Sequence, residues 1–278
     1  MEVIVKRRDF LICVDSDGCV MDGMTIKHMK CFGPCIIEVW GLYKNEEYIL
    51  NKWNEINLFS KTRGINRFKG LALILAWLRE QDLVEDEITD FLNWTNNTRE
   101  LSNAGLEKEI LKSDNASMKK VFLWSKRVNE EIEKMPKDSV KPFEGTKEAL
   151  FEAALQADIA IISSANKEAV YAEWSQYELL QYTNAVMTQE FGSKIECIRQ
   201  QVELGYKKEN VIMIGDAPGD KAAAFENGIL FYPIVAGKET VSWKAFLDSA
   251  LEAFLNGSYQ DAKMADYISI FEKNLKVE

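Results

Sequence analysis

Four aspartates stand in two short motifs whose spacing could bring them into one site. In the first motif, Asp15 and Asp17 follow the apolar run Phe10–Val14, which indicates a strand buried on both faces of a parallel sheet. Because side chains alternate along an extended chain, both carboxylates should project to one side of the strand end, and Gly18 then allows a sharp turn. Open α/β sheets bind ligands at this end of their strands. For this motif alone, a turn or a calcium loop is the alternative.

The second motif is Gly215-Asp216-Ala217-Pro218-Gly219-Asp220, directly after an apolar run. We expect Asp216 at a strand end and Asp220 at the start of a helix, both facing the rim that carries the first pair. A like-charge pair 4 Å apart costs about 4 kcal/mol at an effective dielectric constant of 20. Four close carboxylates therefore favour a bound cation, and Mg²⁺ suits because it prefers a few carboxylates with water and a phosphate. The alternatives are a helix N-cap for Asp220 and a loop acid for Asp216.

Polar and basic residues that could hold a phosphate lie farther along the chain. Ser163, Ser164 and Asn166 fall between a predicted strand and a predicted helix, where free backbone amides can bind an anion. Ordinary helix capping is the alternative for each of them. Lys194 falls in the first turn of another predicted helix, where a cation opposes the helix dipole. This misfit suggests that Lys194 neutralises the carboxylates and a bound phosphate, and a solvated surface lysine is the alternative.

The elements that must position these residues alternate between helix and strand. From residue 143 to residue 240, short apolar runs alternate with helical patterns, which predicts an α/β fold with parallel strands. Residues 24–139 show helical spacing throughout and should form an inserted all-helical domain. We therefore assign residues 1–23 and 140–241 to an α/β core. The segment from Met135-Pro136-Lys137-Asp138 to Pro142-Phe143-Glu144-Gly145 has the composition of a linker. Residues 242–278 are assigned to a C-terminal helical extension of unassigned role.

Composition narrows the class of protein. A net charge of −10 disfavours binding to nucleic acid or to an anionic membrane, and no apolar stretch is long enough to span a bilayer. The N-terminus lacks a secretory pattern, so we expect a cytoplasmic protein. Five cysteines without paired spacing favour free thiols over disulfides or zinc. Oligomeric state stays open.

The motifs together resemble those of the haloacid dehalogenase superfamily. The match consists of Asp15-Ser16-Asp17-Gly18, Ser163 after the second strand, Lys194 before its helix, and Asp216 with Asp220. It covers about residues 1–22 and 143–240, with the helical segment inserted between the first two motifs. The resemblance implies a Rossmann-like parallel-sheet core and a helical cap.

The resemblance also implies roles for these residues. Asp15 would be the nucleophile that forms an aspartyl-phosphate, and Asp17 would protonate the leaving group and then activate water. Mg²⁺ would be held by Asp15, the Asp17 backbone carbonyl and Asp216, with support from Asp220. Ser163 and Lys194 would bind the phosphoryl group. Ser164, beside Ser163, is a further phosphate-binding candidate from its place before a predicted helix, not from the resemblance.

The helical insertion carries one further candidate. Gly64-Ile65-Asn66-Arg67 is similar to a cap loop of β-phosphoglucomutases, in which an arginine grips a second phosphate. Arg67 could therefore bind a distal anion of the substrate, and an ion pair at the surface or within the cap is the alternative. The lone histidine, His28, lies one place away from the position of a mutase histidine, so a structural role competes with proton transfer. Most tryptophans of this segment should belong to its core.

Three functions follow from these patterns. The first is a Mg²⁺-dependent phosphatase that hydrolyses a small phosphorylated metabolite. The second is an intramolecular phosphoryl transfer of the β-phosphoglucomutase type. The third is a non-catalytic binding or regulatory protein that keeps the fold.

Overall fold

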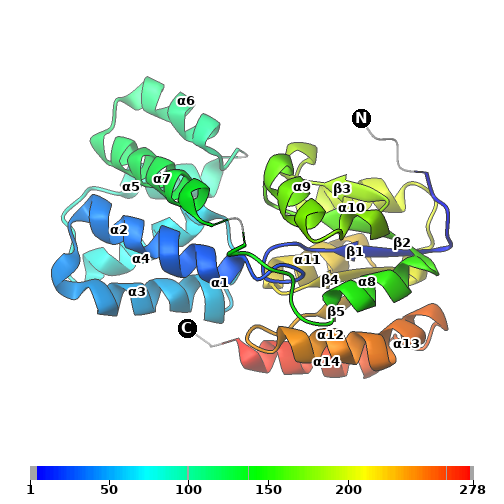
Figure 1. Cartoon of the computed structure of the whole chain (residues 1–278). Coiled ribbons are helices and arrows are strands. Elements are labelled where there is room, and N and C mark those ends of the chain that lie inside the picture. The colour runs from blue at the N-terminus through cyan, green and yellow to red at the C-terminus, as the bar shows by residue number, and fades with distance from the viewer. Residues whose placement is uncertain (1–4, 99, 137, 261, 276–278) are drawn as a thin grey trace. The chain divides into compact units, whose positions relative to one another are not determined.

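The computed structural model describes residues 5–98, 100–136, 138–260 and 262–275 of the chain. These residues form two compact units, a core unit within residues 1–24 and 140–276 and a helical unit within residues 25–139 (Figure 1). The predicted outer domain limits at residues 1 and 278, and Lys137 of the predicted linker, lie outside the described residues. None of the described helices is long and apolar enough to cross a bilayer.

The core unit is built on a parallel sheet whose five described strands have the order β3-β2-β1-β4-β5. The α/β class with a Rossmann-like parallel sheet is thereby confirmed. Strand order reverses between β1 and β4, and open α/β sheets bind ligands at such a point. The strands are β1 (Phe10–Val14), β2 (Ala157–Ile162), β3 (Ala185–Met187), β4 (Val211–Gly215) and β5 (Leu230–Pro233).

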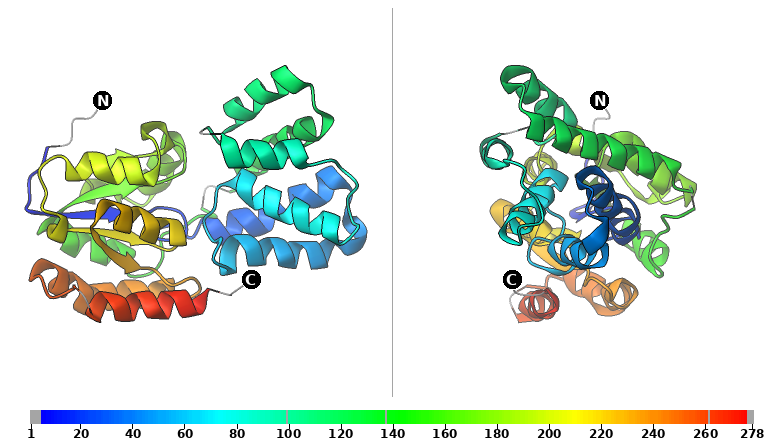
Figure 2. Two further views of the ribbon diagram at one scale, coloured as in Figure 1. Left: turned by 180° about the vertical axis from the view of Figure 1, so that it is seen from behind. Right: turned by 90° about the vertical axis from the view of Figure 1, so that its left-hand side faces the viewer.

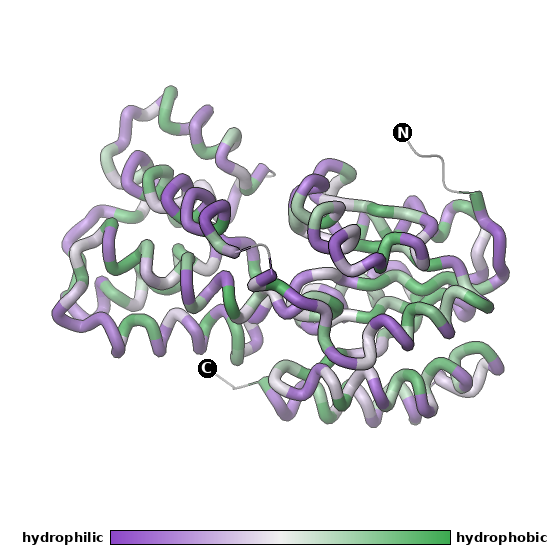
Figure 3. Tube along the Cα trace, viewed as in Figure 1, coloured by the Kyte–Doolittle hydropathy of each residue, from purple (hydrophilic) through white to green (hydrophobic). Residues whose placement is uncertain are grey.

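The two faces of β1 pack against different helices. Ile12 and Val14 belong to an apolar cluster with α8, α9, α12 and α13, whereas Leu11 and Cys13 belong to a second cluster with α10, α11 and α14. Figure 3 shows the strands as largely hydrophobic segments, as expected of strands covered on both faces. The helices of the core unit are α8 (Thr146–Ala154), α9 (Lys167–Gln176), α10 (Lys194–Val202), α11 (Pro218–Asn227), α12 (Glu239–Ala245), α13 (Leu251–Leu255) and α14 (Ala262–Asn274).

The C-terminal extension packs on the core sheet. Residues of α12 and α13 join the first cluster, and Phe271 of α14 joins the second. Figures 1 and 2 show these helices in orange and red beside β5. Tyr232 donates its hydroxyl to the Ser242 carbonyl at 2.6 Å, and Tyr259 donates to the Phe231 carbonyl at 3.0 Å. These bonds fix the extension to β5.

The helical unit has an aromatic core of its own. Trp53 and Trp124 are fully buried, and their ring centroids lie 6.1 Å apart. His28 is buried among them and stacks on Phe32 at 4.6 Å between centroids and on Trp53 at 5.5 Å. The helices of the helical unit are α1 (Met24–Lys27), α2 (Gly33–Trp40), α3 (Glu46–Asn54), α4 (Arg67–Glu80), α5 (Thr89–Asn97), α6 (Asn103–Ser113) and α7 (Ala116–Lys134).

Two local features differ from simple sequence expectation. Strand β3 has no counterpart among the predicted strands, because three residues are too short to leave a periodic signal. Gly33-Pro34, a pair that can break or kink a helix, does not end the helical path here. A π-helical turn at His28–Phe32 leads directly into α2, and Pro34 lies in the first turn of α2.

Candidate active site

Asp15 stands at the carboxyl end of the central strand. Its backbone N–H donates to the Ile214 carbonyl at 3.0 Å, so the parallel ladder with β4 continues one residue past β1. By alternation its side chain shares the face of Leu11 and Cys13, toward α10 and α11. The side chain is buried, with 6% of the residue exposed.

Asp216 and Asp220 follow the neighbouring strand and are also buried. Asp220 occupies the third position of α11 rather than the N-cap, and its Oδ2 accepts the Ala217 N–H at 3.0 Å. A Cβ added to Gly215 would lie 2.4 Å from the Asp220 side chain. Glycine at 215 therefore allows the Asp220 carboxylate to lie directly against the strand end.

Lys194 joins two of these acids. It begins α10 after the N-cap Ser193, and its Nζ lies 2.9 Å from Asp15 Oδ1 and 2.6 Å from Asp220 Oδ1. Only 17% of its side chain is exposed. The alternative of a solvated surface lysine is therefore wrong.

The charges of this site act on one another strongly. Burial raises the pKa of the Asp15 carboxyl well above its usual range; Lys194 opposes this shift, while Asp220 and Asp216 add to it. Burial alone would lower the pKa of Lys194, but the Asp15 and Asp220 carboxylates outweigh it and raise that pKa. The Lys194 ammonium thus pairs with two of the three buried carboxylates.

This donor set fits a hard divalent cation. Asp15, Asp216 and Asp220 each offer a carboxylate oxygen, and the three oxygens lie within 4.8 Å of one another. Oxygen ligands of this kind suit Mg²⁺ or Ca²⁺ rather than zinc. A bound cation would balance the negative charge that Lys194 leaves. The cluster does not include the Asp17 carboxylate, which stands half-buried in the turn before Gly18.

The predicted phosphate-binding residues follow the strand on the other side of β1. Val14 pairs with Ile161, so Ser163 emerges close to the end of β1. Ser163 is buried, and its hydroxyl oxygen accepts the Ala165 N–H at 3.1 Å. Ser164 is exposed. Asn166 caps α9 by accepting the Ala169 N–H at 2.8 Å, which confirms the capping alternative for that residue.

Arg67 lies in the helical unit, at the first position of α4. Its Nη1 donates to Asn129 Oδ1 at 2.7 Å, and its guanidinium lies 5.3 Å from the centre of the Phe32 ring. Burial lowers the pKa of Arg67. Burial lowers the pKa of His28 to about 3, and Arg63, Arg67 and Lys27 add to the shift.

Sequence reasoning did not identify every residue that shapes the site. Trp174 donates its indole N–H to Ser16 Oγ at 2.9 Å, inside the first motif, yet no local pattern links residues so far apart. The close approach of the Asp220 side chain to Gly215 was not predicted from the sequence either. A glycine directly before a strand-end aspartate is the one local signal that could have suggested it.

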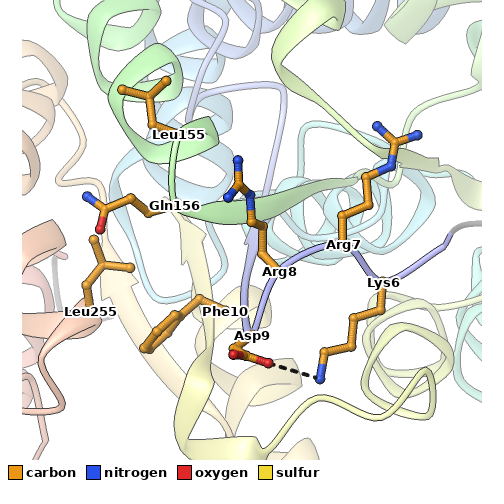
Figure 4. A pocket seen from close by; sticks show the side chains of 8 residues that line it. All are labelled: Lys6, Arg7, Arg8, Asp9, Phe10, Leu155, Gln156 and Leu255. Carbon is orange, nitrogen blue, oxygen red and sulfur yellow. Dashed lines mark ion pairs between the residues drawn. The ribbon is translucent and has the colours of Figure 1, made fainter.

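A pocket of about 630 Å³ lies at the opposite end of β1 (Figure 4). Among its lining residues the only carboxylate belongs to Asp9, which is paired with Lys6 at 3.7 Å. It therefore lacks a group of acids like the one at the carboxyl end. The lining residues are Lys6, Arg7, Arg8, Asp9, Phe10, Leu155, Gln156 and Leu255.

Two solved structures share this fold at low sequence identity, and a third is less similar. A provisionally named phosphoglycolate phosphatase from Lactobacillus delbrueckii subsp. bulgaricus is 11% identical, with a TM-score of 0.53, over 89% of this chain and 98% of the other. A similarly named protein from Haemophilus somnus is 12% identical, with a TM-score of 0.51, over 83% and 87%. A provisionally named beta-phosphoglucomutase from Thermotoga maritima is 18% identical, with a TM-score of 0.47, over 89% and 97%.

Comparison of the sequence with family models identifies the family as well as the fold. No curated protein matches the chain. Residues 65–234, more than half of the chain, match the family model of haloacid dehalogenase-like hydrolases. The matched segment contains Ser163, Lys194, Asp216 and Asp220 but begins after Asp15. The chain belongs to the haloacid dehalogenase-like hydrolase family.

Proposed function

We propose that this protein is a Mg²⁺-dependent phosphatase that hydrolyses a small phosphorylated metabolite through an aspartyl-phosphate. The observation that carries the proposal is the convergence of Asp15, Asp216 and Asp220 at the strand ends, with Lys194 bridging two of them. This combination supplies a nucleophile, a cation site and a positive charge for phosphoryl oxygens.

In this proposal Mg²⁺ is held by Asp15, Asp216 and the Asp17 backbone carbonyl, with Asp220 in support. When bound, the cation neutralises charge on the transferring phosphoryl group. Asp220 has a second task, because it accepts hydrogen bonds from Lys194 and from the Ala217 amide at once. It thereby orients the lysine that faces the nucleophile.

The reaction has two steps. First, an Asp15 carboxylate oxygen attacks phosphorus, the bond from phosphorus to the ester oxygen breaks, and Asp17 gives its proton to the departing alkoxide. Then Asp17 takes a proton from water, which attacks phosphorus, and the bond from phosphorus to Asp15 breaks to release phosphate. Lys194 and Ser163 bind phosphoryl oxygens throughout, and Ser164 contributes from the exposed side of the same turn.

Arg67 is proposed to recognise a second anionic group of the substrate. The support is chemical, because its half-buried guanidinium is hydrogen-bonded to an amide oxygen and lies over an aromatic ring, and among the described residues no ion pair with a carboxylate includes it. Phosphoglycolate carries a carboxylate besides its phosphate. Since two structures of similar fold bear that substrate in their names, it belongs in the first panel of compounds.

The test is a screen of phosphate esters in the presence of Mg²⁺, read as released inorganic phosphate. We expect turnover of at least one ester, its loss on chelation of the metal, and its loss in Asp15→Asn. Full activity of Asp15→Asn would overturn the proposal. Hexose 1-phosphates belong in the same screen, where an isomerised product without phosphate release would indicate a mutase. Turnover of no ester would favour the non-catalytic alternative.

A further inference from the structure

The loop that carries the proposed nucleophile is a compact turn around one carbonyl group. The amides of Cys19, Val20 and Met21 donate to the Ser16 carbonyl at 3.3, 2.9 and 2.9 Å. Gly18, with φ of 85°, donates to the Met21 carbonyl at 2.8 Å. These bonds shape the turn internally, but they do not fix it relative to the helices around it.

Two buried indoles connect this turn to the surrounding helices. Trp174 of α9 donates its Nε1–H to Ser16 Oγ at 2.9 Å. Trp243 of α12 donates its Nε1–H to the Cys19 carbonyl at 2.9 Å. Both tryptophans are fully buried. In Figures 1 and 2, α9 lies toward the β3 edge of the sheet and α12 toward the β5 edge, so the two bonds come from helices at different edges of the sheet.

The alternation of side chains explains why these contacts leave the chemistry undisturbed. Ser16 continues the face of Ile12 and Val14, whose apolar cluster includes both tryptophans. Asp15 continues the opposite face, where Lys194 lies. The hydroxyl of Ser16 is therefore held from the side of the sheet away from the carboxylates.

We propose that Trp174 and Trp243 are positioning residues that fix the turn bearing Asp15 and Asp17. The indoles act through their hydrogen bonds to the Ser16 hydroxyl and the Cys19 carbonyl. Displacement of the turn would break these two bonds and leave buried indole N–H groups without their acceptors, so each bond favours one placement of the turn. The C-terminal extension thereby gains a role at the site, because α12 supplies Trp243. The effect on catalysis rests on the proposed phosphatase function.

The first test removes each donor and keeps an aromatic ring. In Trp174→Phe and in Trp243→Phe, we expect kcat for the phosphate ester to fall about tenfold while KM stays within about twofold of the wild type. Tyr259→Phe is the matched control, because it deletes a buried aromatic donor to the Phe231 carbonyl within the same extension. Its kcat should not change. An equal loss in the control would show that general destabilisation explains the result and would overturn the proposal.

The second test needs no activity. We expect amide hydrogen exchange in the peptide covering residues 15–21 to become about fivefold faster in both tryptophan variants, with no change in β4 and none in Tyr259→Phe. Ser16→Ala should speed exchange in this peptide as much as Trp174→Phe does. Because both changes remove the same bond, the variant that combines Ser16→Ala with Trp174→Phe should exchange no faster than either single variant.

The two readouts separate the possible failures. Unchanged exchange in the turn in both tryptophan variants overturns the proposal, and so does faster exchange with unchanged kcat. Faster exchange in a protein that hydrolyses no phosphate ester supports the placement of the turn by the indoles and rejects the phosphatase function.

Discussion

One cationic side chain in each unit of this chain, Lys194 in the core unit and Arg67 in the helical unit, shows the contrast between them. In the core unit, Lys194 lies 2.9 Å from Asp15 and 2.6 Å from Asp220, so its charge is neutralised inside the site. In the helical unit, Arg67 donates to the Asn129 amide oxygen, and none of the ion pairs between described residues includes it. The first arrangement can hold a cation and a phosphoryl group. The second keeps a positive charge that an anion outside the chain could neutralise.

The two arrangements also differ in how they are held. In the core unit the register of β1 with β4 and the close approach of Asp220 to Gly215 fix the acids. In the helical unit, packing of aromatic rings fixes Arg67 and His28. Strand register tolerates little displacement. Substitutions should therefore act on chemistry in the core unit and on affinity or stability in the helical unit.

The largest effect should come from Lys194→Met. Removing the ammonium leaves buried carboxylates uncompensated, so kcat/KM for a phosphate ester should fall about 1,000-fold. Without metal, the free energy of unfolding should fall by about 3 kcal/mol, and Mg²⁺ should restore part of it. Phosphate release and urea unfolding measure these quantities. Lys221→Met removes the surface pair between Lys221 of α11 and Glu272 of α14 and should cost less than about 1 kcal/mol of unfolding free energy. Equal losses in both variants would contradict the comparison.

Gly215→Ala should follow, because its Cβ would lie 2.4 Å from the Asp220 side chain. Displacement of that carboxylate, and of Lys194 with it, should lower kcat about 100-fold. Gly219→Ala is the control, since a Cβ there meets nothing within 4 Å. That variant should keep full activity and gain up to about 1 kcal/mol of stability. A Gly215→Ala enzyme with wild-type kcat would show that the position of Asp220 is unimportant.

In the helical unit, His28 should make stability depend on pH. Its pKa is lowered to about 3 in the folded chain, so between pH 6.5 and 3 the unfolded state binds a proton that the folded state does not. The free energy of unfolding should therefore fall by about 2 kcal/mol between pH 7 and pH 5 from this group alone. Between pH 7 and pH 5, the free energy of unfolding of His28→Phe should fall by about 2 kcal/mol less than that of the wild type. Urea unfolding followed by tryptophan fluorescence measures the difference, and identical pH dependence in both proteins would contradict the burial of a neutral imidazole.

The smallest effect should come from Arg67→Met. We expect kcat/KM to fall about tenfold through KM for substrates with a second anionic group, and to change little for substrates without one. Arg79→Met removes an arginine of the same helix that pairs with Glu87 at 3.5 Å, and it should leave both classes unchanged. An equal fall in kcat/KM for all substrates would show that Arg67 does not recognise a second anionic group.

The sequence predicted that Asp15, Asp216 and Asp220 lie close together, because strand ends leave local signals. An apolar run followed by acid marks Asp15 and Asp216, and parallel strands bring such ends to one rim. The sequence predicted fewer contacts between residues that lie far apart along the chain. Trp174 and Ser16 are separated by 158 positions, and the short β3 carries no pattern. Packing between helices, which surrounds His28 and Arg67, likewise leaves periodicity in the sequence but no partners.

The most direct test of the account is the identity of the phosphorylated residue. The protein should be mixed with Mg²⁺ and a substrate found in the ester screen, quenched in acid and digested, and its peptides weighed. We predict one added phosphoryl group on the peptide that contains Asp15, absent without Mg²⁺ and absent in Asp15→Asn. Turnover of the substrate with the phosphoryl group on any other residue would contradict the account.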